Sequence, residues 1–175
     1  MDDFIIKKTR KKGLGVFALK SIKKGEHIFH SDLTRLKRYT VKEIEEDPKL
    51  NGDHSDYVGH GKYVVDDSTF SYMNHSCDPN CYVKMKTIQI SDVYALRDVK
   101  KGEELTHDNT ATAVDQFAGK GFWKLKCFCE SKNCRKEYHG DFFKMPKSWQ
   151  KRYYPNLPHS IKRKYKRRFE KLLKS

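Results

Sequence analysis

MNHSCDPNCYV, at residues 73–83, sets two cysteines, a histidine and two asparagines around one proline. Asp78-Pro79-Asn80 is typical turn chemistry, so the centre of the stretch predicts a turn. A turn does not explain why Asn74, His75 and Cys77 stand together just before it. Their role depends on a second cysteine-rich segment further along the chain.

That second segment is CFCESKNC, residues 127–134, which supplies three of the five cysteines of the chain. Two cysteines one residue apart can face one ion, and a third returns after a short loop. Tetrahedral zinc needs four ligands, so the spacing predicts a closed structural zinc site with one ligand from elsewhere. The available donors are Cys77, Cys81, His75 and His139. Three free buried thiols are the plain alternative.

Length and composition favour one folded domain. The chain has 175 residues, of which 37% are hydrophobic and 13% aromatic, enough for a core. No apolar run approaches the roughly 20 residues of a membrane span, so we expect no membrane segment. The N-terminal Met-Asp-Asp-Phe lacks a secretory pattern. We therefore expect an intracellular protein, cytoplasmic in a prokaryote and nuclear or chromatin-associated otherwise.

Positive charge is concentrated at the C-terminus. Residues 159–175 hold eight Lys or Arg and one Glu, and so carry half of the formal +14. Such a segment is attracted to nucleic acid or to acidic protein surfaces. Ile161, Tyr165, Phe169 and Leu172 recur at helical spacing, which predicts a basic amphipathic helix. The alternative is that this apolar stripe docks on its own domain.

The remaining pattern is mainly β. Residues 4–6, 63–66, 81–90 and 93–97 predict short strands, and the echo of KKGE at 23–26 and 100–103 predicts two glycine turns that lead into strands. TVKEIEED at 40–47 predicts a short helix with a capping box. A second short helix is expected before Pro155, so helices are expected mostly near the C-terminus.

Four motifs occur in a recognisable order: GLGVFA (13–18), NHSCDPN (74–80), EELTHD (103–108) and CFCESKNC (127–134). In content and order they resemble the SET domain family with a post-SET zinc cluster, which comprises S-adenosylmethionine-dependent protein lysine methyltransferases. The resemblance covers about residues 4–140. The following segment, YHGDFFKMPKSWQKRYY, is similar to the tail of compact stand-alone SET proteins of prokaryotes.

The resemblance implies a mainly β fold of small curved sheets with a knot-like crossing, in which the Asn-His-Ser-Cys and Glu-Leu-Thr strands lie side by side. It divides the chain into a SET domain (4–118), a post-SET zinc-binding segment (119–140) and a basic helical extension (141–175). It also implies two cofactors, S-adenosylmethionine and zinc, and a protein substrate with a target lysine. The oligomeric state stays open.

Site residues carry over by position. The resemblance implies that one set of residues binds the cofactor and a second set binds zinc, while Cys81 belongs to neither set and is a free thiol. The cofactor set is Leu14, Gly15, Val16, Asn74 and His75, with Trp123 or Phe122 stacking on adenine. The zinc set is Cys77, Cys127, Cys129 and Cys134.

The catalytic motif departs from the family. There the Glu-Leu-Thr motif continues aromatic-Asp-Tyr, and that tyrosine is the main catalytic residue; here the chain has His107-Asp108-Asn109. An active enzyme then needs a hydroxyl from another tyrosine, with His107 as a proton acceptor and Asn109 accepting a hydrogen bond from the amine. The tyrosine candidates are Tyr57, Tyr63 and Tyr72.

Two alternatives follow from this departure and from the charge. One is a catalytically degenerate SET protein that keeps the cofactor and zinc sites as a scaffold. The other, from a different class, is a zinc-stabilised nucleic-acid-binding module, favoured by the basic segment 159–175. Charge alone gives only sequence-independent attraction, and no nucleic-acid-reading motif is present. We therefore favour the enzyme, with possible substrates among histones and other basic, nucleic-acid-associated proteins.

Overall fold

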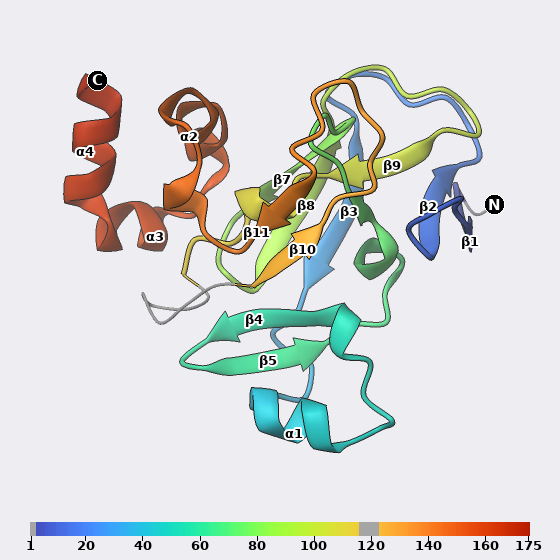
Figure 1. Cartoon of the computed structure of the whole chain (residues 1–175), viewed down its shortest axis with the longest axis horizontal. Coiled ribbons are helices and arrows are strands. Elements are labelled where there is room, and N and C mark those ends of the chain that lie inside the picture. Colours follow the sequence, from blue (N-terminus) through green and yellow to red (C-terminus); the bar gives the residue numbers. More distant parts are fainter. Residues whose placement is uncertain (1–2, 116–122) are drawn as a thin grey trace.

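The computed structural model describes residues 3–115 and 123–175. Small antiparallel sheets dominate its first two thirds, and helices gather in the last third (Figure 1). One sheet has the strand order β1-β2-β9-β6, with the bounds Phe4–Lys8, Leu14–Ala18, Glu104–His107 and Asn74–His75. A second has the order β3-β8-β7, with the bounds His27–Asp32, Ile90–Ala95 and Cys81–Met85. Two hairpins complete the β structure: β4 (Ser55–Gly59) with β5 (Lys62–Val65), and β10 (Lys124–Lys126) with β11 (Glu137–His139).

The strands that carry the Asn-His-Ser-Cys and Glu-Leu-Thr motifs lie side by side, as expected. Strand β6 pairs in parallel with β9, so that Asn74 faces Thr106 and His75 faces His107. On its other edge β9 pairs with β2, where Val16 faces Leu105. Val16 and Leu105 are fully buried in the main core. This burial fixes the register, because a one-residue slip would turn the apolar side chains to solvent.

The two KKGE segments form matching glycine turns. Gly25 and Gly102 adopt φ values of +83° and +84°, a left-handed conformation that only glycine adopts without strain. Each turn leads into a strand, β3 or β9, which confirms the prediction. The residues before the turns also pair with each other, through an antiparallel bridge between Ile22 and Val99.

The prediction of one strand over residues 81–90 is wrong in its second half. β7 ends at Met85, and a tight turn leads to β8, which starts at Ile90. The Thr87 hydroxyl closes this turn by accepting from the backbone N–H groups of Gln89 and Ile90, both at 3.0 Å. Local side-chain hydrogen bonds of this kind compete with strand pairing. The prediction missed the turn because the apolar Ile88 continues the strand-like pattern of the sequence.

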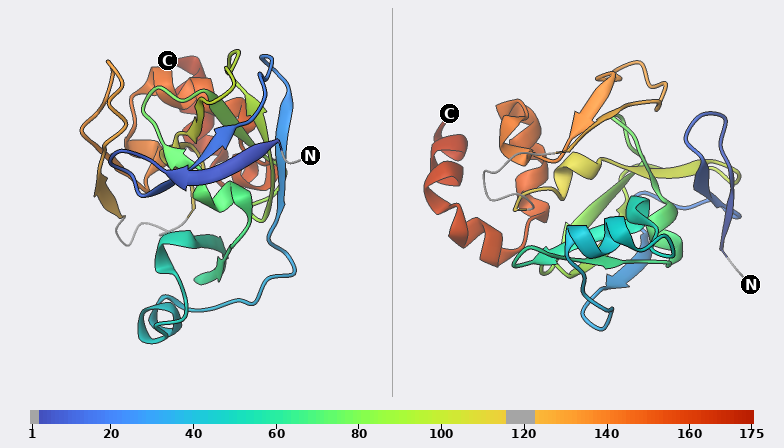
Figure 2. Two further views of the ribbon diagram at one scale, coloured as in Figure 1. Left: turned by 90° about the vertical axis from the view of Figure 1, so that its right-hand side faces the viewer. Right: turned by 60° about the horizontal axis from the view of Figure 1, so that its bottom comes forward.

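The helices bear out the expected caps and stripe. Helix α1 (Val41–Glu46) has Thr40 as N-cap, with the full capping box to Glu43. Helices α2 (Lys147–Tyr153), α3 (His159–Lys164) and α4 (Lys166–Lys174) form a group at the end of the molecule opposite β1 (Figures 1 and 2). The predicted tail helix is broken at Tyr165, the C-cap of α3.

The tail is docked on its own domain. Ile161, Phe169 and Leu172 are buried in a second core, together with Phe142 and Val114 from the preceding segments. The apolar stripe therefore packs inward, and the basic side chains face outward. Across the described ranges, no helix combines the length and apolar character needed to cross a membrane.

Candidate active site

Four cysteines from two distant segments converge on one point. The Sγ atoms of Cys77, Cys127, Cys129 and Cys134 all lie within 4.8 Å of one another. The Sγ atoms of Cys77 and Cys127 are 3.7 Å apart. A tetrahedral zinc with Zn–S bonds of about 2.3 Å holds its sulfurs about 3.8 Å apart, so the arrangement fits that ion. Cys81 stays apart, fully buried in the main core.

Hydrogen-bond donors surround this cluster. The backbone N–H of Arg135 points to Cys77 Sγ at 3.3 Å, and that of Lys136 points to Cys134 Sγ at 3.4 Å. His75 accepts at Nδ1 from the Asn109 N–H, at 3.2 Å, and its Nε2 lies 3.4 Å from both Cys77 Sγ and Arg135 Nη2. Donors of this kind stabilise thiolate ligands and orient them. The cluster thus has the chemistry of a closed metal site.

A buried carboxylate ties the cluster to the rest of the fold. The Asp108 side chain is fully buried and accepts two hydrogen bonds from the Arg135 guanidinium, both at 2.9 Å. It also accepts from Trp149 Nε1 at 3.1 Å and from the Thr110 N–H at 3.2 Å. Asp108 therefore joins the end of β9 to the cysteine-rich segment and to helix α2.

A cavity of about 290 Å³ lies between the first motifs and the cysteine-rich segment. Its residues come from both parts and mix aromatic, apolar and basic side chains. They are Lys12, Asn74, His75, Leu125, Lys126, Cys127, Phe128 and Tyr138. The His75 and Tyr138 rings are stacked, with centroids 3.8 Å apart. Burial lowers the pKa of His75 to about 3, so this ring is neutral at physiological pH.

The glycine loop lies directly beside Asn74. The Asn74 amide donates to the Leu14 carbonyl at 2.7 Å and to Glu104 Oε1 at 2.9 Å. A Cβ on Gly15 would lie 2.7 Å from Glu104 Oε1 and 2.9 Å from Asn74 Nδ2. Only glycine therefore permits this close approach. The structure brings Gly15 and Asn74 together, while Val16 is buried in the core and Leu14 is exposed.

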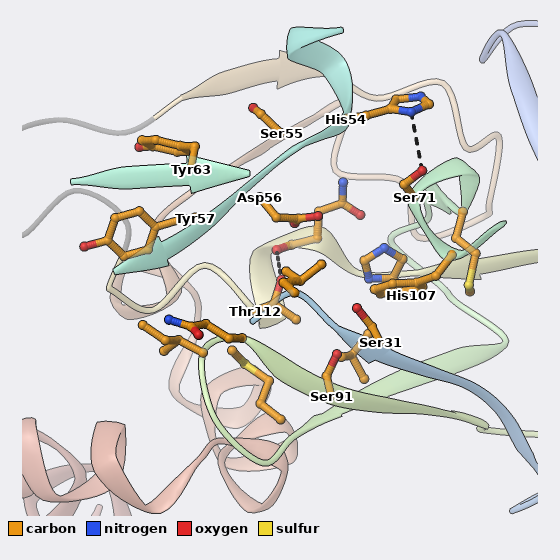
Figure 3. A pocket seen from close by; sticks show the side chains of 18 of the residues that line it. Ser31, His54, Ser55, Asp56, Tyr57, Tyr63, Ser71, Ser91, His107 and Thr112 are labelled. Atoms are coloured by element: carbon orange, nitrogen blue, oxygen red, sulfur yellow. Dashed lines mark hydrogen bonds between the residues drawn. The ribbon is translucent and has the colours of Figure 1, made fainter. Parts of the chain in front are cut away.

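A second, larger cavity of about 410 Å³ lies between the β4–β5 hairpin and the β3-β8-β7 sheet, beside the end of β9 (Figure 3). Its lining includes His107, Asn109, Tyr57, Tyr63 and Asp56. Leu125 lines both cavities, so the two share a wall.

Its inner wall holds unpaired polar atoms. Among the described residues, His107 Nδ1 and Asn109 Oδ1 are buried and have no hydrogen-bond partner. Burial lowers the pKa of His107 to about 4, so the imidazole is neutral at physiological pH and able to accept a hydrogen bond. Burial and the nearby Asp66 raise the pKa of Asp56 to about 6.

Of the predicted aromatic residues that the structure describes, three line the larger cavity and one lines neither cavity. Tyr57 and Tyr63 line the larger cavity, with ring centroids 5.4 Å apart. Tyr72 is not among the residues lining either cavity; its ring packs edge-on against His54. Trp123 lines the larger cavity and not the smaller one. Phe122 lies outside the described residues.

Sequence reasoning missed several lining residues. Lys12, Leu125, Phe128 and Tyr138 of the smaller cavity gave no signal except that Phe128 stands between two cysteines. In the larger cavity it missed Asp56 and several small polar side chains, namely Ser31, Ser55, Ser71, Ser91 and Thr112. These lie on separate strands and turns, and no local pattern links them.

Together, the paired strands β6 and β9, the glycine loop and the cysteine cluster define a mainly β domain with two adjoining cavities. A family model described as the SET domain matches residues 13–108, more than half of the chain. The chain therefore belongs to the SET domain family.

Relatives with curated names agree with this assignment. Histone-lysine N-methyltransferase set-2 of Caenorhabditis elegans is 31% identical over 137 residues, covering 73% of this chain and 9% of the relative. Histone-lysine N-methyltransferase TRX1 of Oryza sativa subsp. japonica is 32% identical over 143 residues, covering 73% and 13%. This chain thus spans only about a tenth of the length of these two relatives.

Solved structures share the fold. The methyltransferase domain of human histone-lysine N-methyltransferase SETMAR aligns with a TM-score of 0.52 and 22% identity, over 76% of this chain and 56% of that one. KRYPTONITE, solved in complex with mCHG DNA and SAH, aligns with a TM-score of 0.54 and 19% identity, over 77% and 28%.

Proposed function

We propose that this chain is an S-adenosylmethionine-dependent protein-lysine N-methyltransferase. The observation that carries the proposal is the pair of cavities that share Leu125. One is flanked by the glycine loop and the Asn74–His75 strand, and the other ends at His107 and Asn109. A methyl donor on one side and an amine on the other would meet at this shared wall. The names of the relatives support the same activity.

The smaller cavity is the proposed site of S-adenosylmethionine, which supplies an electrophilic methyl group when bound. Asn74 and His75 line this cavity and would hold it. The loop at Leu14–Gly15–Val16 does not line the cavity; it would contribute backbone groups beside Asn74, and Gly15 lets that loop approach Asn74 and Glu104 closely. The stacked His75–Tyr138 pair and Phe128 offer flat apolar surfaces for an adenine ring. Trp123 stays a weaker candidate for this role, because it lines the other cavity.

Zinc is the proposed ion of the four-cysteine cluster. With four protein thiolates the site is closed, so its role is structural. It would fix the β10–β11 segment, including Leu125 and Phe128, over the smaller cavity. Asp108, through Arg135, reinforces the same attachment.

The larger cavity is the proposed lysine site. A free lysine amine has a pKa of about 10.4 and must lose its proton before it can attack. Burial in a poorly hydrated cavity lowers that pKa. His107 Nδ1 and Asn109 Oδ1, which lack partners, would then accept hydrogen bonds from the amine. Tyr57 or Tyr63 would supply the hydroxyl that the family tyrosine provides elsewhere, and Tyr72 is the less suitable candidate.

Substrates and partners follow from the names and the charge. The relatives' names support a histone or another basic, nucleic-acid-associated protein as the substrate, and hence an intracellular location. We divide the chain into a SET domain (4–118), a post-SET segment (119–140) and a C-terminal extension (141–175) that carries the basic residues. Arg163, Arg167 and Lys171 are exposed on its helices and would contact nucleic acid or an acidic protein.

The activity is tested by incubating the metal-loaded chain with methyl-labelled S-adenosylmethionine and core histones, or with a lysate of basic proteins. Mass spectrometry should find label on lysine side chains. Label transfer would exclude the degenerate scaffold. If the chain binds the cofactor yet labels nothing in a broad lysate, the scaffold is the better description.

The contribution of the tail is tested separately. Because residues 159–175 carry core side chains, deletion would damage the fold, and charge neutralisation is the cleaner perturbation. The combined variant Arg163→Gln, Arg167→Gln, Lys171→Gln should weaken DNA binding and flatten its salt dependence, while methyl transfer to a short peptide persists. DNA binding by a wild type that transfers no methyl group would favour a nucleic-acid-binding module.

A further inference from the structure

One carboxyl group of the larger cavity has no partner among the residues that the structure describes. Asp56 lies on β4, opposite Val64 of β5, and points into the cavity (Figure 3). No hydrogen bond or ion pair to its side chain is formed by the part of the chain that the structure describes. The neighbouring Asp66, by contrast, is satisfied locally by the N–H and hydroxyl of Ser68, at 2.9 and 2.8 Å. A half-buried carboxylate that points into a cavity without a protein partner is a candidate for contact with a ligand.

The same cavity offers two further acceptors and no fixed cation. His107 Nδ1 and Asn109 Oδ1 are buried without partners. The lining that the structure describes includes no lysine or arginine. Its polar groups therefore suit a ligand that donates several hydrogen bonds and carries positive charge. A lysine ammonium, with three donors on one nitrogen, has this chemistry.

We propose that Asp56 is a catalytic residue of the methyl transfer: it pairs with the target lysine's ammonium group as it enters, and then accepts its proton. This inference rests on the proposed function. In this scheme the Asp56 carboxylate on the β4–β5 hairpin, and not a water molecule, removes the proton from the lysine ammonium. His107 and Asn109 then hold the neutral amine.

The proton transfer balances within the cavity. One N–H bond of the ammonium breaks, its electron pair stays on nitrogen, and an O–H bond forms on the Asp56 carboxylate. The products are a neutral amine and a neutral carboxylic acid. Transfer removes two charges from a poorly hydrated site, where burial penalises each of them. The lone pair on the amine is then available to accept a methyl group, and the acid returns its proton to water.

The protonation behaviour of Asp56 agrees with this role. Its pKa is raised to about 6 by burial and by Asp66. It is therefore ionised at physiological pH and a stronger base than an ordinary aspartate. General bases work best when their pKa lies near the operating pH.

The test compares Asp56→Asn with the matched control Asp67→Asn. Asp67 is an exposed carboxylate close to the same hairpin that does not line the cavity. Asp56→Asn keeps the size of the side chain and removes an unpaired charge, so the variant should fold. We expect its kcat/KM to fall about 100-fold or more, with S-adenosylmethionine affinity within twofold of wild type. Asp67→Asn should match wild type, and Asp56→Glu should recover part of the lost rate.

A binding measurement gives an independent readout. Calorimetry should show that wild type prefers a substrate peptide with lysine over one with norleucine, the uncharged analogue, by about tenfold. Asp56→Asn should lose that preference. An active wild type with Asp56→Asn within threefold of its rate, or with the lysine preference intact, overturns the role of Asp56 and leaves the proposed function standing. If wild type itself transfers no methyl group, the proposed function fails, and the catalytic role of Asp56 fails with it.

Discussion

Asp108→Asn should lower the free energy of unfolding by about 3–5 kcal/mol, because it breaks a buried ion pair from one side. The Asp108 side chain is fully buried, and both its oxygens accept from Arg135. Asparagine has the same shape but turns an NH₂ group toward these donors. The Arg135 guanidinium, only 24% exposed, is then left without its counter-charge.

The magnitude follows from what else Asp108 holds. Its carboxylate also accepts from Trp149 Nε1 and caps the short helical turn at Thr110. Each hydrogen bond to a charged group contributes about 1.5–3 kcal/mol, with strong non-additivity within one network. Domains of this size are usually stable by about 5–15 kcal/mol, so the variant should be near the limit of folding.

Urea denaturation of the metal-loaded protein, followed by circular dichroism, measures the effect. Glu130→Gln is the control: Glu130 forms ion pairs with Arg10 and Lys11, but all three side chains are at least 44% exposed. Solvent screens such pairs, so its unfolding midpoint should stay at the wild-type value. Asp108→Asn within about 1 kcal/mol of wild type would show that the network contributes little, contrary to its burial.

Three further outcomes are expected. Cys129→Ser should bind less than the one zinc ion per chain expected of wild type, and metal analysis measures this. The variant, like wild type treated with a chelator, should also bind S-adenosylmethionine more weakly in calorimetry. Undiminished cofactor binding would contradict this expectation. Gly15→Ala should weaken cofactor binding tenfold or more, because its Cβ would lie within 3 Å of Glu104 and Asn74. The control Gly52→Ala, whose Cβ would have its nearest contact at 3.5 Å, should bind the cofactor like wild type. Equal affinities of the two variants would refute the close-approach argument. Burial lowers the pKa of His107 to about 4, whereas an unfolded histidine has a pKa near 6.5, so the unfolded state takes up a proton first as the pH falls. Between pH 7 and 4.5 the free energy of unfolding of wild type should therefore fall by about 2 kcal/mol more than that of His107→Gln. Urea titrations at each pH measure this difference, and parallel curves for the two proteins would argue against a buried neutral imidazole.

Several elements could be predicted because their signals are local or chemically distinctive. The capping box at Thr40 and the glycine turns at Gly25 and Gly102 depend on residues within a few positions. Cysteines carry a specific chemistry, so the cluster at 127–134 pointed to a missing ligand that the structure supplies from Cys77, fifty residues earlier. The pairing of β6 with β9 came from the resemblance and not from any pattern.

The remaining features depend on tertiary packing. Tyr72 and Trp123 looked suitable by residue type, but Tyr72 lines neither cavity, and Trp123 lines the larger cavity instead of the smaller one. Asp56 gave no signal, since one aspartate in a strand is unremarkable until its surroundings are known. The break of the tail at Tyr165 likewise lies within an uninterrupted apolar stripe.

The most direct test of the proposed site is a calorimetric titration of the metal-loaded chain with S-adenosylmethionine. We predict one saturable site per chain, with an affinity that falls when the four-cysteine cluster is stripped of metal. Absence of any binding heat at ligand concentrations up to the millimolar range, in a protein shown to be folded and metal-loaded, would contradict the existence of a cofactor site between Gly15, Asn74 and the cysteine-rich segment.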